Sequence, residues 1–553
     1  MLSLANCCQA TGTSMVAPNK KLAHSLTFLR RLQEDGRGVY RSAEFSREDR
    51  ERLVRHGWLA PIVKGWLMAS EPSVLDHDST PWHAAFWEFC SRYCAHRFGS
   101  RWHLSPDLSL TLHAESSTVP SQVIVRAADA GNHRIDLPFE TSLFNLKSPR
   151  EPAAEDLCLK DGLRLFTVEA ALLRVPKRFF QDHPVEAQTA LASVRQVTEL
   201  VRRLLEGSHS KVAGRLAGAF RHIGRDRFAD EILRAMRDTE HDVRESNPFS
   251  LDDGQAASAR RSIRGYTSPP ITHRIKTLWD LARNPILDAF PAPPGLPVEA
   301  DAKERFLKQA HEIYVTDAYH SLSIEGYRVT QDLIDQVRAG DWDPEHVPED
   351  RKQHDTLAAR GYWQTFLAVQ KSIGDILNGA NAGETFRTDH GRWFFELFEP
   401  FVAVGVYGPS GLGGYRNQPV YLQGSRHVPP RYEVVPDAMD TLFALLEEES
   451  HPAARAVAGH WLFGHIHPHR DGNGRIARFL MNAMLASGGY PWTVIRVDDR
   501  KRYLAALETA SVKQDFTAFA AFVSESVRAN TPTGAMIDVT NKRPTKRNRP
   551  QRL

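Results

Sequence analysis

Twelve consecutive residues carry the side chains best suited to phosphate chemistry: His467-Pro-His-Arg-Asp-Gly-Asn-Gly-Arg-Ile-Ala-Arg478. A histidine such as His467 can be neutral near pH 7 and accept a proton from an attacking hydroxyl. Asp471 offers hard oxygen ligands of the kind that suit Mg²⁺ bound to phosphates. Arg475 and Arg478 can each hold phosphate oxygens through two hydrogen bonds and stabilise charge in a transition state. The segment therefore predicts in-line attack of a hydroxyl on phosphorus.

Two helices are expected to position these side chains. Residues 455–466 have apolar side chains at helical spacing, and Pro468 should end that helix. A second helix is predicted by an apolar face that contains Ile476, Phe479, Leu480, Ala483, Met484 and Leu485. In the loop 471–474, glycines let successive N–H groups turn toward one point at the positive end of the second helix, which favours an anion. Two arginines in the first turns oppose the helix dipole unless an anion offsets them.

Simpler interpretations of the segment exist. A glycine-capped corner between two helices would also contain Gly-Asn-Gly, but it would not require a histidine, an aspartate and two arginines at fixed spacing. The dinucleotide fingerprint G-x-G-x-x-[GA] fits residues 472–477, but it needs an apolar strand before it, and 465–470 is no such strand. No G-x-x-x-x-G-K-[ST] loop surrounds the glycines. Chemistry at phosphorus is therefore the preferred interpretation.

The twelve residues resemble the signature of the Fic family, H-x-F-x-[DE]-G-N-G-R-x-x-R, whose members transfer AMP from ATP to protein hydroxyls. The likeness covers about 298–529 and implies a mainly α fold with an all-helical core. It implies that His467 is the base, that Asp471 binds Mg²⁺, and that ATP is held by Arg470, Gly472, Asn473, Gly474, Arg475, Arg478 and Tyr503. His469 stands where the family has phenylalanine, which puts the packing under the loop in doubt.

A second resemblance lies upstream, in residues 405–430. This segment is expected to form a loop and a β-hairpin with a strand over 416–423, similar to the family's flap. Val420 and Tyr421 are the candidates for the flap edge, which would pair with the backbone of the target beside the site. An ordinary surface hairpin is the alternative.

A third resemblance is Ser321-Leu-Ser-Ile-Glu325-Gly326, which matches the family's inhibitory motif [ST]-x-x-x-E-[GN]. The resemblance implies that Glu325 pairs with Arg478 and so occupies the cation that would hold the γ-phosphate. It also implies that the same glutamate can serve the reverse reaction, which removes AMP from a modified target. Without the signature, the segment would be an ordinary helix end with glycine after the cap.

Composition limits the classes of function. The chain has 553 residues, of which 42% are apolar and 25% charged, with a formal net charge of +3. This near balance argues against a protein that coats nucleic acid. We expect a cytoplasmic protein, because no apolar run is long enough for a membrane and residues 1–21 do not form a secretory signal. The five cysteines suggest reduced thiols, and Cys90 and Cys94 near His96 lack a second pair of zinc ligands, so packed thiols are favoured.

The chain divides into seven predicted segments. These are a disordered start (1–20), a winged helix-turn-helix-like domain (21–72), a small α+β module (73–166), a helical region (167–290), a Pro-rich linker (291–297), the Fic domain with its inhibitory helix (298–529) and a basic disordered tail (530–553). In the α+β module we expect a helix around 82–98 and strands such as 108–112 and 123–126. The linker is the clearest predicted boundary.

The N-terminal domain is predicted from two helices, about 22–32 and 46–57, and a hairpin over 58–68. Its second helix carries four arginines that could contact DNA phosphates: Arg47, Arg50, Arg52 and Arg55. The segment resembles the N-terminal domain of AbiEi-type antitoxins, which repress their own operons. The alternative is a small helical cap with a solvated charged face, because acidic residues alternate with the arginines.

These features together predict an autoinhibited protein adenylyltransferase that uses Mg²⁺ and ATP. Its partner would be a protein with a Ser, Thr or Tyr hydroxyl, which could be the enzyme itself. Two alternatives stay open: removal of AMP by the same site, and a DNA-binding regulator that uses the Fic domain as a sensor. A homodimer is possible. It is also left open whether the inhibition acts within one chain or across two.

Overall fold

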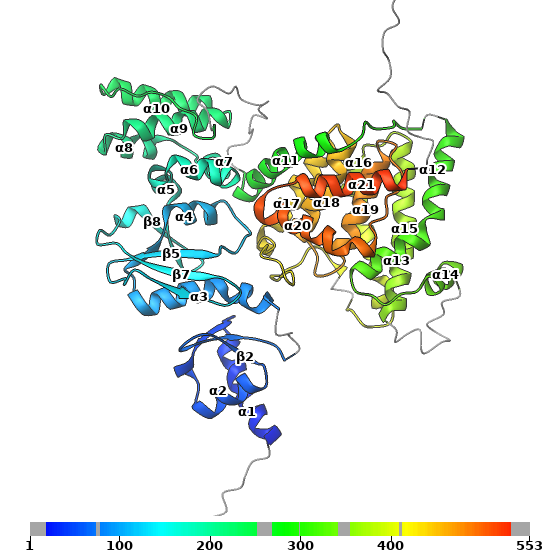
Figure 1. The fold of residues 1–553 in the computed structure, drawn as a ribbon, viewed down its shortest axis with the longest axis horizontal. Coiled ribbons are helices and arrows are strands. Elements are labelled where there is room, and N and C mark those ends of the chain that lie inside the picture. The colour runs from blue at the N-terminus through cyan, green and yellow to red at the C-terminus, as the bar shows by residue number, and fades with distance from the viewer. Residues whose placement is uncertain are drawn as a thin grey trace, which may run out of the picture. The chain divides into compact units, whose positions relative to one another are not determined.

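The computed structural model describes residues 18–72, 78–250, 268–297, 299–340, 354–408 and 412–531. The chain is mainly helical and divides into two compact units, Met1–Pro270 with Tyr421–Val428, and Ile271–Val420 with Pro429–Leu553 (Figure 1). Residues 1–17 of the expected disordered start and 532–553 of the expected tail lie outside the described residues. Among the helices that the structure describes, none combines the length and apolar character needed to cross a lipid bilayer.

The first part of the first unit contains the two helices and the hairpin that the sequence predicts. Its elements are α1 (Pro18–Gln33), β1 (Val39–Arg41), η1 (Ser42–Glu44), α2 (Arg47–Arg55), β2 (Leu59–Val63) and β3 (Trp66–Ala69). The strands form an antiparallel sheet in the order β1-β3-β2. Ser46 caps α2, because its side chain accepts a hydrogen bond from the N–H of Asp49. The likeness to a winged helix stays a prediction.

The expected α+β module follows in the same unit. Its elements are α3 (Thr80–Phe98), β4 (Trp102–Leu104), α4 (Pro106–His113), β5 (Gln122–Ala127), β6 (His133–Asp136), β7 (Ser142–Lys147), η2 (Ala154–Asp156), β8 (Leu157–Lys160) and β9 (Leu163–Phe166). The larger sheet has the order β4-β5-β7-β6, with β5 and β7 parallel. Cys90 and Cys94 are free thiols packed in the hydrophobic core between α3 and this sheet.

The strand predicted over 108–112 is wrong, because these residues form α4. Helix-start signals just upstream outweigh the alternating pattern. The Ser105 side chain accepts from the N–H of Leu108, Pro106 occupies the first turn, and Asp107 adds the acidic charge that favours a helix start.

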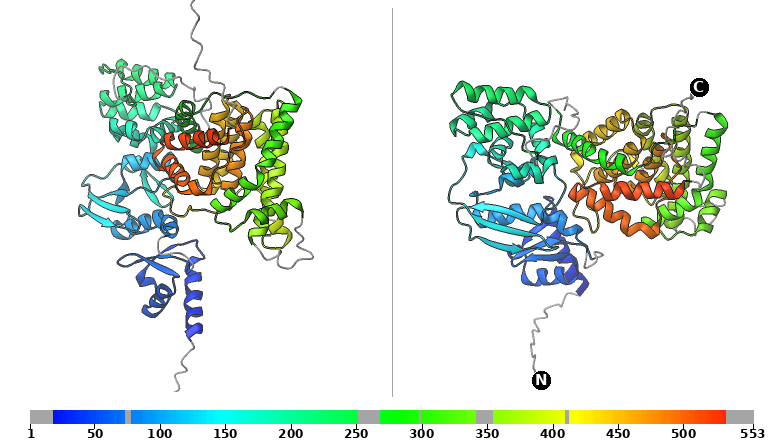
Figure 2. Two further views of the ribbon diagram at one scale, coloured as in Figure 1. Left: turned by 45° about the vertical axis from the view of Figure 1, so that its right-hand side comes forward. Right: turned by 45° about the horizontal axis from the view of Figure 1, so that its top comes forward.

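The helical region consists of α5 (Val168–Arg174), α6 (Lys177–Asp182), α7 (Pro184–Ser193), α8 (Thr198–Glu206), α9 (Ser210–His222) and α10 (Asp226–Asp238). Helices α8, α9 and α10 pack side by side (Figure 2). Three apolar side chains of α8 and α9 are fully buried: Leu204, Leu216 and Phe220. Three more are partly buried against the same core: Val201, Leu205 and Val212.

The second unit is built from helices. They are α11 (Pro270–Ala289), α12 (Ala300–Glu312), α13 (Tyr314–Ile324), α14 (Gln331–Ala339), α15 (His354–Leu377), α16 (Ala382–Ala403), α17 (Val435–Glu448), α18 (Pro452–Ile466), α19 (Asn473–Ala486), α20 (Arg500–Lys513) and α21 (Thr517–Asn530), with short turns η4 (Tyr432–Val434) and η5 (Val497–Asp499). Helix α19 packs against α13, α15, α16 and α18. It is therefore buried on nearly all sides and not on the one face that its apolar pattern predicts.

The boundary between the two units does not lie at the predicted linker 291–297. The chain divides at Pro270, ahead of α11, so that the Pro-rich stretch belongs to the second unit. The hydroxyl of Tyr490 donates to the carbonyl of Pro291 at 2.6 Å, and the N–H of Gly295 donates to the carbonyl of Gly488 at 3.0 Å. These bonds hold the stretch against the helices of the second unit.

Candidate active site

His467 lies where α18 ends and the loop begins. Its backbone has φ 53° and ψ 59°, a left-handed conformation that side chains other than glycine seldom adopt. Nδ1 lies 3.3 Å from the carbonyl oxygen of Gly464. Because a carbonyl only accepts, this bond places the ring proton on Nδ1 and leaves Nε2 able to take a proton. Burial lowers the pKa of His467 to about 4, so the imidazole is neutral at pH 7.

The conformation of His467 is held by Arg416, which the sequence interpretation did not single out. Arg416 Nε donates to the carbonyl of His467 at 2.8 Å, and its guanidinium also donates to the carbonyls of Pro430 and Ile466. The N–H of Arg416 donates to the carbonyl of Pro468 at 2.8 Å. Arg416 is 4% exposed, so one buried cation satisfies several carbonyls around the start of the loop.

The loop from Asp471 to Gly474 reaches the N-terminus of α19. Gly472 has a φ of 79° and caps the helix. Asn473 orders the loop through its amide group, because Oδ1 accepts from the N–H of His469 at 3.0 Å and Nδ2 donates to the carbonyl of His469 at 2.8 Å. The Asn473 side chain is thus occupied, and the main-chain N–H groups of the first turn are left to bind an anion.

Asp471 and Arg475 face each other across the first turn of α19. Asp471 Oδ1 accepts from the N–H of Gly472 at 2.5 Å and from Arg475 Nη2 at 3.3 Å. The Asp471 side chain is 53% exposed, whereas that of Arg475 is 1% exposed. The carboxylate can therefore reach a hydrated cation without leaving the loop. Arg470 points elsewhere, and its Nη2 donates to Asn417 Oδ1 at 2.8 Å.

Arg478 is bound by the predicted inhibitory segment. Its Nη2 donates to Glu325 Oε1 at 2.7 Å and to the carbonyl of Ser321 at 3.0 Å, while Nε donates to Ser321 Oγ at 2.8 Å. Helix α13 ends at Ile324, Glu325 is its C-cap, and Gly326 follows with a φ of 93°. The segment and the arginine belong to one chain and to one unit.

The charges around Glu325 stabilise its ionised form. Burial alone would raise the pKa of Glu325, but Arg478 and Arg475 outweigh burial and hold that pKa below its ordinary value. Gly474 makes room for the carboxylate, because a Cβ at that position would collide with Glu325 Oε1. The glycine of the loop and the glutamate of α13 therefore meet at the place where the helix N-terminus favours an anion.

Polar side chains lie beneath this pair. Tyr503, expected to contact adenine, is 2% exposed, and its hydroxyl lies 2.7 Å from His460 Nε2. In this structure the ring lies under Arg478 and offers no open face, although the adenine contact stays a prediction. The hydroxyl of Tyr362 donates to Asp317 Oδ2 at 2.7 Å, and burial raises the pKa of Asp317 to about 6.

His469 fills the position of the family's phenylalanine as an aromatic ring. It stacks on Phe394 with centroids 3.8 Å apart and planes 11° from parallel. Burial lowers the pKa of His469 to about 3, so the ring is uncharged. The packing under the loop, which the substitution puts in doubt, is made by a neutral imidazole.

The strand predicted over 416–423 is wrong, as is the hairpin around it. In the described residues of 405–430 no strand forms. Arg416 points inward to the carbonyls near His467, and Pro419 has no N–H to donate to a ladder. Val420 and Tyr421 consequently present no strand edge in this structure.

Residues 421–428 belong to the first unit, where they contact the loop after α4. An isolated antiparallel bridge joins His427 to Thr118. Two backbone hydrogen bonds flank this bridge. The N–H of Val119 donates to the carbonyl of Arg426 at 3.1 Å, and the N–H of Val428 donates to the carbonyl of Ser117 at 2.6 Å. This pairing lies beyond the predicted flap strand and does not involve the flap candidates Val420 and Tyr421.

Comparison with known proteins agrees with this geometry. Residues 390–485 match the sequence model of the Fic/DOC family. The chain contains a Fic domain. Proteins named protein adenylyltransferase Fic are similar to it: the one from Nematostella vectensis is 39% identical over 120 residues, which are 21% of this chain and 27% of that protein. The one from Culex quinquefasciatus is 29% identical over 229 residues, 40% of this chain and 41% of that protein.

The chain therefore spans less than half the length of these curated relatives. A solved structure, Fic-1 (residues 134–508) of C. elegans, is 17% identical, with a TM-score of 0.33, and the match covers 66% of this chain and 88% of that one. The matched Fic segment contains α18, the loop and nearly all of α19, whereas Glu325 lies outside it.

Proposed function

We propose that the Fic domain transfers AMP from ATP to a hydroxyl of a protein and that Glu325 restrains this transfer at rest. The observation that carries the proposal is the contact of 2.7 Å between Glu325 Oε1 and Arg478 Nη2, next to an anion-binding helix start and a neutral histidine. An acid at that place takes the position of a phosphate group. The relatives named adenylyltransferases support the choice of ATP as donor.

The geometry supports a single displacement at the α-phosphorus. The hydroxyl of the target gives its proton to Nε2 of His467 while its oxygen forms a bond to the α-phosphorus. The bond between that phosphorus and the bridging oxygen breaks, and pyrophosphate leaves with the electron pair. Main-chain N–H groups at the start of α19, together with Arg475 and Arg478, stabilise the charge on the departing phosphates.

The side chains beside the loop fit an Mg²⁺ ion that arrives bound to ATP. In the part of the chain that the structure describes, no three His, Cys, Asp or Glu side chains gather as metal ligands. A single exposed carboxylate, Asp471, suits an ion that keeps several waters and takes its other ligands from phosphates. When bound, Mg²⁺ would offset phosphate charge, and Asp471 would fix its position beside the loop.

The restraint follows from competition for one cation. While Glu325 and Ser321 hold Arg478, its Nε and Nη2 are engaged and are not offered to a γ-phosphate, and the carboxylate repels phosphates entering beside it. Both partners belong to one chain, so this restraint requires no second copy. Removal of AMP with help from Glu325 is the alternative reaction at the same site, because the carboxylate could also act on a water.

Intact-mass spectrometry of the full chain with Mg²⁺ and ATP tests the proposal. Glu325→Gly should gain the mass of one or more AMP groups, the unchanged chain much less, and Glu325→Gly with His467→Ala none. Glu299→Gly is a matched control, since Glu299 is an exposed N-cap of α12 that makes no capping bond. If the first variant neither modifies itself nor labels proteins of a cell extract with AMP, AMP transfer is contradicted.

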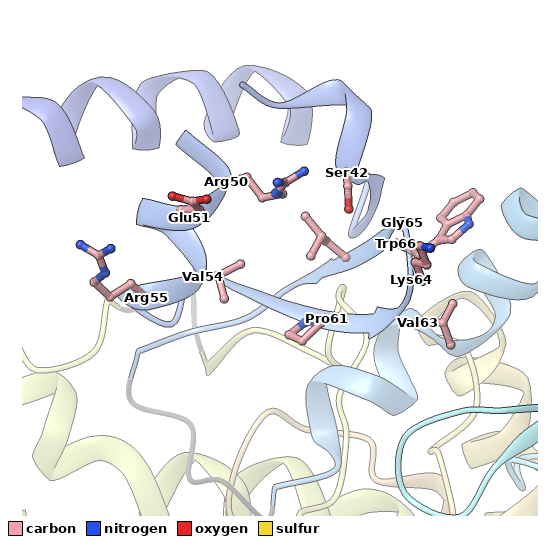
Figure 3. A pocket seen from close by; sticks show the side chains of 11 residues that line it. Ser42, Arg50, Glu51, Val54, Arg55, Pro61, Val63, Lys64, Gly65 and Trp66 are labelled. Atoms are coloured by element: carbon pink, nitrogen blue, oxygen red, sulfur yellow. The ribbon is translucent and has the colours of Figure 1, made fainter. Parts of the chain in front are cut away.

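We propose DNA binding as a second function, carried by a groove in the first unit. The groove, about 500 Å³ in volume, lies between α2 and the β2–β3 hairpin and is lined by Arg50, Arg55 and Lys64 (Figure 3). Arg47 is engaged with Glu51 at 2.8 Å, and Arg52 with Ser25 at 2.6 Å. Two of the four predicted arginines thus line the groove, together with Lys64 from the hairpin and the carboxylate of Glu51.

This second function is tested by titration of a labelled DNA duplex. Arg50→Ala with Lys64→Ala should weaken binding and reduce the slope of log affinity against log salt by about two, since each lost phosphate contact lowers it by about one. Arg178→Ala, a change at an exposed arginine of α6 paired with Asp182, should leave the slope unchanged. No binding of the full chain at low salt would exclude DNA as a partner.

A further inference from the structure

A tyrosine two residues beyond Glu325 covers the other arginine of the signature. Arg475 Cζ lies 5.1 Å from the ring centroid of Tyr327 and 5.2 Å from that of Phe398. The Arg475 side chain is 1% exposed. Cations over aromatic faces are held most strongly when water is excluded, so the two rings stabilise a guanidinium in this position.

The arrangement leaves Arg475 short of hydrogen-bond acceptors. Among the residues that the structure describes, its side chain makes one long hydrogen bond, 3.3 Å from Nη2 to Asp471 Oδ1, while Nε and Nη1 are buried and have no partner. Buried donors without acceptors are costly, and phosphate oxygens would satisfy them. Because both nitrogens are buried, a phosphate can reach them only after a neighbouring group moves.

Of the two rings, Tyr327 is the one placed to move. Phe398 lies within α16, is 1% exposed and supports the loop, since a Cβ at Gly472 would lie 2.7 Å from its ring. Tyr327 follows Gly326, whose φ is 93° and whose surroundings are open. Residues 327–330 form no regular element. A pivot of the chain at Gly326 would break the bond of 3.1 Å from the N–H of Tyr327 to the carbonyl of Leu322 at the end of α13, and would leave the rest of that helix in place.

We propose that Tyr327 is a second restraint on the site, which acts on Arg475 as Glu325 acts on Arg478. This inference rests on the proposed AMP transfer and deepens it. One short segment, 325–327, occupies both arginines, so its displacement frees both. Stacking of Tyr327 on His354, 5.4 Å between centroids, and the bond of 3.1 Å from Arg328 N to Asp355 Oδ1 tie the segment to the start of α15. A partner that moves the start of α15 would thereby act on both restraints.

Tyr327→Ala in the full chain tests the restraint, with Tyr327→Phe as the matched control that keeps the ring. The alanine variant should raise AMP transfer at low ATP by roughly tenfold, through a lower KM for ATP, the size expected for loss of a desolvated cation–π contact. The phenylalanine variant should stay at the resting level. Added to Glu325→Gly, Tyr327→Ala should lower the KM for ATP further, because the two side chains cover different arginines.

Isothermal titration with ATP gives a readout that does not depend on transfer. In a His467→Ala background, Tyr327→Ala should bind ATP roughly tenfold more tightly, whereas general damage to the site would weaken binding. Equal or weaker binding would overturn the restraint and make Tyr327 a support for Arg475. If Glu325→Gly fails to transfer AMP, the proposed function fails on its own, and the titration still decides the role of Tyr327.

Discussion

The guanidinium of Arg416 donates from Nε to the main-chain carbonyl of His467 at 2.8 Å. One residue thereby joins the segment that resembles a flap to the backbone of the proposed base. The left-handed backbone conformation of His467 is costly for a residue that carries a Cβ. The contact with Arg416 therefore stabilises the conformation that orients the imidazole.

Replacement of Arg416 should separate positioning from nucleotide binding. Arg416→Met keeps much of the buried side chain but removes every donor, and we expect it to lower AMP transfer by Glu325→Gly about 100-fold. ATP affinity should change by less than about threefold, because Arg416 does not face the helix start. Single-turnover transfer and ATP titration measure the two effects. Equal losses of transfer rate and of ATP affinity would show that Arg416 supports the fold of the loop as a whole.

His469 should be replaceable by phenylalanine. His469→Phe keeps the stack on Phe394 and should change the free energy of unfolding by less than about 1.5 kcal/mol. His469→Ala removes the ring from the core under the loop and should cost about 3 kcal/mol. Urea denaturation of the three proteins measures both differences. A phenylalanine variant as unstable as the alanine variant would show that the imidazole nitrogens matter.

Ser321→Ala should loosen the restraint without abolishing it. The hydroxyl accepts from Arg478 Nε at 2.8 Å, and a hydrogen bond to a charged group contributes about 1.5–3 kcal/mol. Glu325 remains, so we expect AMP transfer to rise by about tenfold or more, but less than in Glu325→Gly. Initial rates with labelled ATP compare the variants. A Ser321→Ala rate equal to that of the unchanged chain would remove Ser321 from the restraint.

The pH dependence of transfer should lack a step near pH 6.5. The proposed base acts when unprotonated, and burial lowers the pKa of His467 to about 4, so activity should persist as pH falls and be lost only near pH 4. The kcat/KM of Glu325→Gly, measured between pH 4.5 and 8.5 in buffers of constant ionic strength, checks this. Half-loss at pH 6.5 would mean that the imidazole is solvated in the active state.

Stability should also fall on the acid side of neutrality. Burial lowers the pKa of His460 and of His469 to about 3. The unfolded chain therefore binds more protons than the folded one between pH 6.5 and about 3, and the free energy of unfolding decreases as pH falls through that window. Urea midpoints at pH 5 and pH 7 measure the decrease. His469→Phe should reduce it, because one of the two histidines is then absent.

The sequence by itself determined the local features. The break at Pro468, the start of α19 and the cap at Ser46 follow from the conformational limits of proline and glycine and from side chains that bond to nearby N–H groups. Each depends on residues within about one turn of one another. Short alternating patterns were weaker guides, since the stretch 108–112 became helical under the capping signals before it.

Only the tertiary structure decided which distant groups meet. The pairing of Glu325 with Arg478 was expected from the family likeness, but the cover that Tyr327 places on Arg475 and the hold of Arg416 on His467 were not. Nor was the pairing of His427 with Thr118. Burial, charge and hydrogen bonding act between groups that packing brings together, and side-chain spacing along the chain does not encode those neighbours.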